Sequence, residues 1–142
     1  MGLTPARWLV DTSVLARVAV PAVSLALTPR LQSGLVGVCL ATELEVGYSA
    51  QSTAHYAKQR ASLLGQLLAV PMPFRAEQRA REVQAELVAR GHHRSAGVAD
   101  LMVAAIAEIE GLTVLHYDTD FDTIAAVTGQ RVEWIVPRGS LT

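Results

Sequence analysis

Short hydrophobic runs and longer amphipathic stretches alternate along the chain. Four runs are apolar and only a few residues long, which is typical of buried strands: residues 8–10, 35–40, 113–117 and 132–136. The longer stretches predict helices, and these fall at residues 22–32, 53–68, 77–90, 98–107 and 123–128. Because strands alternate with helices, the pattern predicts an α/β fold with a mostly parallel central sheet that helices cover.

Capping and breaking residues set limits to some of these elements. Thr42 is expected to cap a helix after the second strand. The helix over 77–90 is expected to end at Gly91 and to bury one apolar face, made of Ala80, Val83, Leu87 and Val88. The proline-rich segment 70–74 predicts an edge strand or a loop, because proline lacks the N–H that a central strand must donate.

Composition narrows the class of protein. The chain has 142 residues, 51% of them hydrophobic and 18% charged, which is typical of one globular domain over 1–142. Cys39 is the single cysteine, so an internal disulfide and a multi-cysteine zinc site are excluded and a buried thiol is expected. Met1 to Arg7 lacks the apolar core of a signal peptide, and prolines interrupt the apolar stretch after Arg17. A cytoplasmic protein without a membrane span is expected.

Charge alone does not indicate a nucleic-acid partner, since the formal net charge is −1 at pH 7. Of the 12 basic residues, all except Lys58 are arginines. Arginine suits bidentate contacts with phosphate, but a GC-rich genome produces the same bias.

Acidic residues recur at the junctions between the predicted elements. Asp11 follows the first strand, Asp118 follows the third, and Glu45 lies in the first turn after the second. Asp100 lies early in an otherwise apolar helix. Because parallel sheets form their sites beyond the carboxyl ends of the strands, these four acids are expected to meet in one cleft. Carboxylates gathered in a cleft repel one another unless a cation such as Mg²⁺ or Mn²⁺ is bound, so the pattern predicts a metal-dependent hydrolase acting on a phosphate ester.

The same residues also have structural interpretations. Asp11 or Ser13 can simply cap the helix that follows. Asp100 can be a buried acid whose charge is satisfied by a nearby backbone N–H or by Arg94. The loop over 91–97 carries His92, His93 and Arg94, which either contact a phosphate or belong to a solvated loop.

Four short motifs follow one another in the chain. They are Asp11-Thr12-Ser13-Val14-Leu15, Thr42-Glu43-Leu44-Glu45-Val46-Gly47, Asp100-Leu101 before an alanine-rich helix, and His116-Tyr117-Asp118-Thr119-Asp120-Phe121. In this order they resemble the PIN domain family and, more closely, the VapC-type toxins of bacterial toxin–antitoxin pairs. The resemblance covers nearly the whole chain and implies a three-layer, PIN-like α/β fold.

The resemblance implies a Mg²⁺- or Mn²⁺-dependent endoribonuclease that cleaves tRNA or another structured RNA. Asp11, Asp100 and Asp118 match the acids with which the family binds its metal and performs catalysis. Asp120 lies just beyond them, as a further ligand or as a helper acting through water.

The remaining acid of the family is ambiguous, because Glu43 and Glu45 both occur. The family's Thr-x-x-Glu spacing, counted from Thr42, selects Glu45. Two residues apart on a helix, the glutamates point about 200° apart, so only one can face the cleft. Glu43 is therefore expected to be solvated or paired.

Substrate and partner contacts are also implied. Thr12 or Ser13 would orient Asp11 or touch the RNA, and Arg94 would contact phosphate. A cognate antitoxin is the implied inhibitor, with a homodimer or a toxin–antitoxin hetero-oligomer as the assembly. The helix over 77–90 and the apolar segment after Asp11 offer surfaces for a partner helix, although such faces usually belong to the core.

Two other functions compete with the nuclease. One is a PIN-like binding module whose acids are only structural. The other is a phosphatase of the haloacid-dehalogenase type, which needs a second aspartate two residues after the nucleophile and a lysine late in the chain. Ser13 occupies the first of these places and Lys58 is the only lysine, which disfavours the phosphatase.

Overall fold

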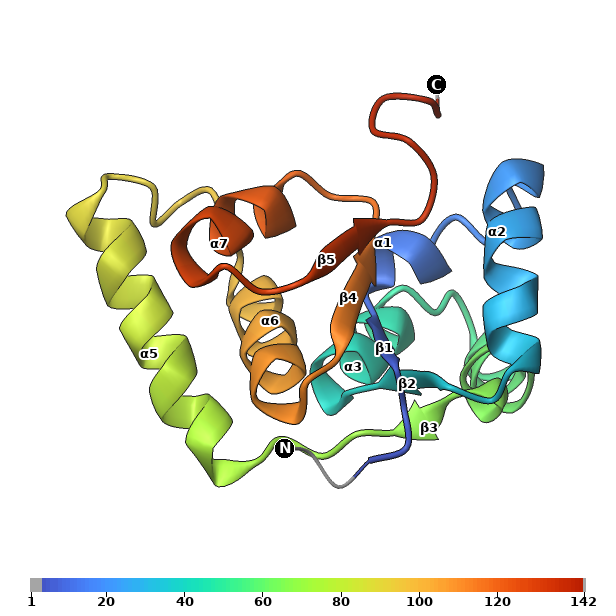
Figure 1. Ribbon diagram of the computed structural model, residues 1–142. Coiled ribbons are helices and arrows are strands. Elements are labelled where there is room, and N and C mark those ends of the chain that lie inside the picture. The colour runs from blue at the N-terminus through green and yellow to red at the C-terminus, as the bar shows by residue number, and fades with distance from the viewer. Residues whose placement is uncertain (1–3, 142) are drawn as a thin grey trace.

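A five-stranded parallel sheet forms the centre of the computed structural model, which describes residues 4–141 (Figure 1). The strands are β1 (Trp8–Val10), β2 (Val36–Val38), β3 (Leu68–Ala69), β4 (Thr113–His116) and β5 (Val132–Trp134). They lie in the order β3-β2-β1-β4-β5, and all four pairings are parallel. The predicted α/β architecture is confirmed.

Helices connect the strands and cover both faces of the sheet. They are α1 (Thr12–Leu15), α2 (Pro21–Gln32), α3 (Leu40–Tyr48), α4 (Thr53–Lys58), α5 (Phe74–Ala89), α6 (Val98–Glu110) and α7 (Asp120–Thr128). A π-helical turn, η1 (Gln59–Leu63), and a 3₁₀ turn, η2 (Leu64–Gln66), continue α4. Among the described residues, no helix combines the length and the apolarity that crossing a bilayer requires.

The two faces of the sheet are buried in separate hydrophobic clusters because side chains alternate along a strand. Leu9 of β1 and Val114 of β4 pack against α5, α6 and α7. Their neighbours Val10 and Leu115 point to the other side and pack against α1 and α2. All four are completely buried, which accounts for the uninterrupted apolar runs of these strands.

The strand order reverses between β1 and β4. From β1 the chain adds β2 and then β3 on one side, and afterwards returns to add β4 and β5 on the other. Asp11 and Asp118 follow the two strands at this reversal. In open parallel sheets, a crevice forms at such a point beyond the carboxyl ends of the strands.

The second strand is shorter than expected, and the helix after it begins earlier. Cys39 is extended and precedes the first residue of α3, Leu40, whose side chain is 65% exposed. Thr42 therefore does not cap the helix; it is buried inside the first turn, 3.9 Å from the Cys39 sulfur. Glu45 consequently lies in the second turn of α3, not the first. The buried thiol expected at Cys39 is confirmed.

The limits of two helices also differ from the sequence prediction. The helix expected over 53–68 changes to a π turn after Lys58, and its last residue already belongs to edge strand β3. The last helix begins at Asp120 and not at Thr123, because a carboxyl oxygen of Asp118 accepts the Asp120 N–H at 2.9 Å and starts the turn.

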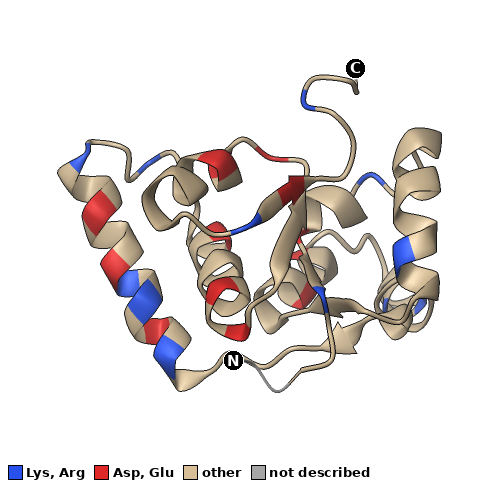
Figure 2. Ribbon diagram, viewed as in Figure 1, with Lys and Arg blue, Asp and Glu red and all other residues tan. Residues whose placement is uncertain are grey.

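The helix predicted over 77–90 is α5, which starts three residues earlier at Phe74. Its solvent side carries basic and acidic residues along its length (Figure 2). Val83 and Leu87 are buried as expected, whereas Val88 is 53% exposed. The assignment of Val88 was wrong because one residue along a helix is a rotation of about 100°, which takes position 88 off the face that holds position 87.

Candidate active site

Asp11 enters the site from the end of β1. Its N–H donates to the Leu115 carbonyl of β4 at 2.9 Å, which extends the sheet by one residue. One carboxyl oxygen accepts the Ser13 N–H at 2.9 Å and so caps α1. The other oxygen, Oδ1, is buried and has no hydrogen-bond partner among the described residues. The cap explains one oxygen only, and burying the second without a partner is costly.

Asp100 is held in place by its own helix. It is the third residue of α6, and its Oδ2 accepts the Gly97 N–H at 3.0 Å as in a capping box. A nearby backbone N–H thus satisfies one oxygen, as the structural interpretation supposed. The bond also fixes the direction in which the carboxyl group points.

Two further acids, Asp118 and Asp120, follow β4; Asp120 is the first residue of α7. Carboxyl oxygens of Asp100, Asp118 and Asp120 lie within 4.8 Å of one another. His116 fixes the backbone of this segment, because its Nδ1 accepts the Asp118 N–H at 3.1 Å. The structure therefore brings together three acids that are up to 20 positions apart in the sequence.

Burial and mutual repulsion act on this acid cluster of Asp100, Asp118 and Asp120. Burial raises the pKa of Asp100 to about 7, and the hydrogen bond with Asp120 and the negative charges of Asp11 and Asp118 act in the same direction. The pKa of Asp120 is raised by burial and by Asp118. Burial also raises the pKa of Asp11, and the charge of Glu45 adds to that effect. The site is short of positive charge.

Glu45 lies beside Asp11 but outside the cluster of three. It is an exposed residue of α3, and its carboxylate accepts the hydroxyl hydrogen of Thr12 at 2.6 Å. Glu43 points elsewhere and pairs with Arg60 at 2.8 Å. The two glutamates diverge as expected from their spacing, and Glu43 is paired.

The other residues expected to contact substrate differ in position. The Ser13 hydroxyl accepts the Tyr117 N–H at 2.9 Å and so ties α1 to the end of β4. Arg94 is exposed on the loop before α6, as are His92 and His93. These three loop residues form no part of the acid cluster.

His116 is a site residue whose role sequence reasoning did not identify. Its ring is completely buried between Phe121 and Trp134, at centroid distances of 5.0 and 4.9 Å. Burial lowers the pKa of His116, so the imidazole is neutral and Nδ1 is free to accept the Asp118 N–H. The signal in the sequence was a histidine at the end of a strand, directly after the apolar Val114 and Leu115.

The donor set fits a hard divalent cation. Three carboxylates converge, a fourth offers a buried oxygen without a partner, and all are oxygen ligands of the kind that Mg²⁺ and Mn²⁺ prefer. The raised pKa of Asp100 also favours a cation site, because a bound cation would relieve the repulsion that helps to raise it.

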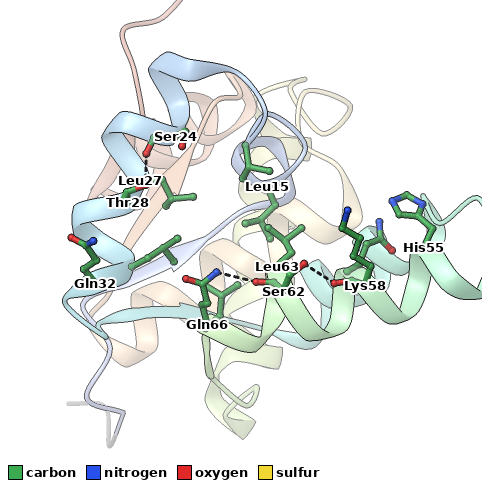
Figure 3. Close-up of a pocket in the computed structure, with 14 residues that line it drawn as sticks. Leu15, Ser24, Leu27, Thr28, Gln32, His55, Lys58, Ser62, Leu63 and Gln66 are labelled. Carbon is green, nitrogen blue, oxygen red and sulfur yellow. Dashed lines mark hydrogen bonds between the residues drawn. The ribbon is translucent and has the colours of Figure 1, made fainter.

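An apolar groove begins on the other side of α1. It has a volume of about 550 Å³ and lies between α2 and the α4–η2 segment (Figure 3). Leu15, Leu27 and Leu63 form its floor, while Thr28, Ser62 and other polar residues form its rim. Because Leu15 and Thr12 belong to the same turn of α1, this α2–α4 groove and the site share one short element.

Comparison with known proteins places the chain in a family. The model of the PIN domain matches residues 8–127. Ribonuclease VapC2 from Mycobacterium tuberculosis (strain CDC 1551 / Oshkosh) is 43% identical over 139 residues, which are 96% of this chain and 97% of the relative. Ribonuclease VapC18 from M. tuberculosis (strain H37Rv) is 44% identical over 134 residues, covering 93% of this chain and 97% of the relative.

Solved structures agree on the fold. The DNA-bound VapBC of Salmonella typhimurium covers 92% of this chain and 99% of its own with a TM-score of 0.74 at 20% identity. VapBC2 from Rickettsia felis, bound to a promoter DNA fragment, covers 89% of this chain and 97% of its own with a TM-score of 0.76 at 15% identity. The chain therefore belongs to the PIN domain family, where it groups with the ribonucleases VapC.

Proposed function

We propose that this protein is a divalent-metal-dependent endoribonuclease and the toxin of a toxin–antitoxin pair. The observation that carries the proposal is the convergence of Asp100, Asp118 and Asp120 with Asp11 where the strand order reverses. The kinship with proteins named ribonuclease VapC, over nearly the whole length of both chains, supports it.

In this proposal Asp11, Asp100 and Asp118 hold the cation, which is Mg²⁺ or Mn²⁺, and Asp120 is a further ligand or acts through water. When bound, the cation neutralises these carboxylates, activates water and stabilises charge on the attacked phosphodiester. The chain itself supplies orientation. The Gly97 N–H fixes Asp100, the Ser13 N–H fixes Asp11, and His116 fixes the backbone of Asp118.

Glu45 is the remaining metal-binding and catalytic acid of this proposal, and it lies at the edge of the site. Thr12 donates to it, so the hydroxyl orients a carboxylate that points into solvent near Asp11. Ser13 is occupied by the Tyr117 N–H, which favours a structural role over substrate contact. Contact of Arg94 with phosphate stays a prediction, and the exposed loop leaves its side chain free to reach RNA.

The first test is a nuclease assay on purified protein with total RNA, with Mg²⁺, with Mn²⁺ and with EDTA. We expect cleavage only with a divalent ion and a loss of at least about a hundredfold in Asp100→Asn, because a ligand of the proposed cation is removed. Glu86→Gln is the matched control, since it exchanges a carboxylate for an amide on the outer side of α5, where it pairs with Arg90.

Two outcomes would contradict this proposal, one for the activity and one for the site. Folded protein that cleaves no RNA with either ion would favour the binding module. Cleavage that persists in Asp100→Asn would show that the acid cluster is not the active site.

We further propose that the cognate antitoxin inhibits the toxin through the α2–α4 groove. An apolar floor with a polar rim suits one face of an amphipathic helix. A solved structure with the same fold is a toxin–antitoxin complex from Klebsiella pneumoniae. Because Leu15 in the floor is three residues from Thr12, a helix in the groove ends close enough to the acids for its flanking residues to cover them.

A further inference from the structure

A second cavity opens directly beside the acid cluster. It has a volume of about 500 Å³, which is within the range of small-ligand sites. Asp118 belongs both to its wall and to the acid cluster. The remaining wall residues come from α1 and the turn after it, from the segment after β4, and from the end of β5 and the chain after it: Ser13, Arg17, Tyr117, Thr119, Trp134, Arg138 and Gly139. The chain after β5 rises beyond the carboxyl end of the sheet in Figure 1.

The cavity holds two guanidinium groups that the fold does not neutralise fully. Arg17 donates to the Ser13 carbonyl at 2.7 Å and lies over the Tyr117 ring at 5.0 Å, but among the described residues it has no carboxylate partner. Arg138 only approaches Asp122, at 4.0 Å, and its side chain is 68% exposed. An arginine has five N–H donors, so both keep donors available for a ligand.

This arrangement contrasts with that of three other arginines of the chain. Arg30, Arg60 and Arg79 each hold a carboxylate of a distant segment at 2.8 Å or less. Those arginines have a structural partner. Arg17 is instead fixed by a carbonyl and an aromatic ring, which position the group and leave its charge unmatched.

We propose that Arg17 and Arg138 bind a phosphate of the RNA next to the phosphodiester that is cleaved, and that Tyr117 and Trp134 line the space for the attached nucleoside. This inference rests on the proposed nuclease function. Planar guanidinium groups suit phosphate, and aromatic and guanidinium planes suit the unstacked bases of single-stranded RNA. The two positive charges also offset the repulsion between the acids and the RNA backbone close to the site.

Two aromatic rings form part of the cavity wall next to Asp118. The Tyr117 and Trp134 rings meet edge to face at 5.3 Å, and the Trp134 N–H is held by Asp122 at 3.2 Å. These contacts fix both rings in the wall. Because Asp118 belongs both to this wall and to the acid cluster, RNA bound in the cavity would bring the adjacent phosphodiester to the acids.

The test measures RNA binding and cleavage in Arg17→Gln/Arg138→Gln. Binding is measured by fluorescence anisotropy of a labelled tRNA pool with Mg²⁺ at several salt concentrations, in the Asp100→Asn background so that the RNA stays intact. We expect the Kd to rise about tenfold or more, as for the loss of hydrogen bonds to charged groups. The slope of log K against log[salt] should fall in magnitude by about 0.7, since the contact with one single-stranded phosphate is lost.

Cleavage separates binding from chemistry. In the otherwise native protein, the double variant should raise KM about tenfold while kcat at saturating RNA stays close to that of the parent. Arg81→Gln/Arg90→Gln is the matched control, because it removes two arginines from the i,i+4 ion pairs of α5. This control should change neither KM nor the salt slope.

Single variants guard against misfolding. Arg138→Gln alters only an exposed residue after the last strand, and Arg17→Lys keeps a donor for the Ser13 carbonyl. Unchanged Kd, salt slope and KM in folded Arg17→Gln/Arg138→Gln, with cleavage still abolished by Asp100→Asn, would overturn the phosphate site and leave the nuclease intact. If the parent protein neither binds nor cleaves RNA, both proposals fail.

Discussion

Asp100 combines two roles that are usually separate. Its carboxyl group caps α6 through the Gly97 N–H, and the same group is one of the three clustered acids. A cap favours the ionised form, whereas burial and the neighbouring acids oppose it, and the balance leaves a pKa of about 7. The residue that caps the helix is therefore also one that would readily accept a cation in place of a proton.

This balance predicts how the stability of metal-free protein depends on pH. The pKa of Asp100 is about 7 in the folded state, against an ordinary value of 3.8, so between these values the folded state binds one proton more than the unfolded state. Stability contributed by this group is therefore fully present below the ordinary pKa, is lost as pH rises to about 7, and does not change further above that. In EDTA, the melting temperature of Asp100→Asn should exceed that of the parent by more at pH 8 than at pH 5.

Thermal denaturation followed by circular dichroism measures this difference. Comparing two variants at each pH cancels the opposite contribution of His116, whose lowered pKa favours the folded state as pH rises. Mg²⁺ at pH 8 should raise the melting temperature of the parent more than that of Asp100→Asn. Equal melting temperatures of both proteins at pH 8 in EDTA would show that ionised Asp100 does not destabilise the folded protein.

At the residue scale, the sequence predicted where the acids lie better than how they are held. Asp11 and Asp118 could be placed because strand ends in parallel sheets converge. The divergence of Glu43 and Glu45 followed from helix geometry alone. For Asp100 the sequence offered a backbone N–H as partner but not which one, and the role of His116 did not follow, since both depend on backbone N–H groups whose directions are set only by the folded turns.

At the element scale, close packing of the strands depends on one small residue. Gly37 lies in the middle of β2, and a Cβ there would come within 2.5 Å of Val70 Cγ2 and 3.3 Å of the Trp8 carbonyl. β2 is thus flanked tightly by the backbone of β1 and by the end of β3. The apolar run did predict a strand here, but the reason for its glycine appears only from its neighbours.

We expect Gly37→Ala to destabilise the protein by about 1–3 kcal/mol, as overpacking does in a filled core. Gly65→Ala is the matched control: its new Cβ would meet nothing closer than 3.5 Å, so it should stabilise by about 0.4–1 kcal/mol through the unfolded state. Urea denaturation measures both. A neutral Gly37→Ala would mean that β2 and β3 separate easily.

Element limits were the weakest part of the sequence prediction. The error at α3 arose because Cys39 and Leu40 are apolar and so continued the strand pattern, although Leu40 begins a helix and is exposed. The end of the predicted 53–68 helix failed for a similar reason. Leucines at helical spacing run on through a π turn and a 3₁₀ turn into β3, and composition does not distinguish these conformations.

At the scale of the whole molecule, α1 links the two surfaces that matter for function. At its start Asp11 caps the helix and belongs to the site, and at its end Leu15 lies in the floor of the α2–α4 groove. The parallel sheet covered by helices was predictable from the alternation of strands and helices. Of the two partner surfaces that the sequence offered, α5 uses its apolar face for the core, whereas the apolar segment after Asp11 does contribute Leu15 and Val18 to the groove.

The groove predicts a variant that separates toxicity from inhibition. Ser62→Arg places a bulky charged side chain on the exposed rim, so RNA cleavage should be retained while inhibition by the co-purified cognate antitoxin weakens about tenfold or more. Ser33→Arg, also exposed but outside the groove, is the control. Full inhibition of the Ser62→Arg nuclease would place the antitoxin elsewhere.

The two tryptophans lie on opposite faces of the sheet. Trp8 packs below Arg30 of α2 at 5.5 Å, and Trp134 donates its indole N–H to Asp122 of α7. Their emission consequently reports on two separate environments, one a cationic pocket and the other the border of the acid cluster. Replacing Trp8 with phenylalanine would leave a single tryptophan, beside the site, by which ion and RNA arrival could be timed without a label.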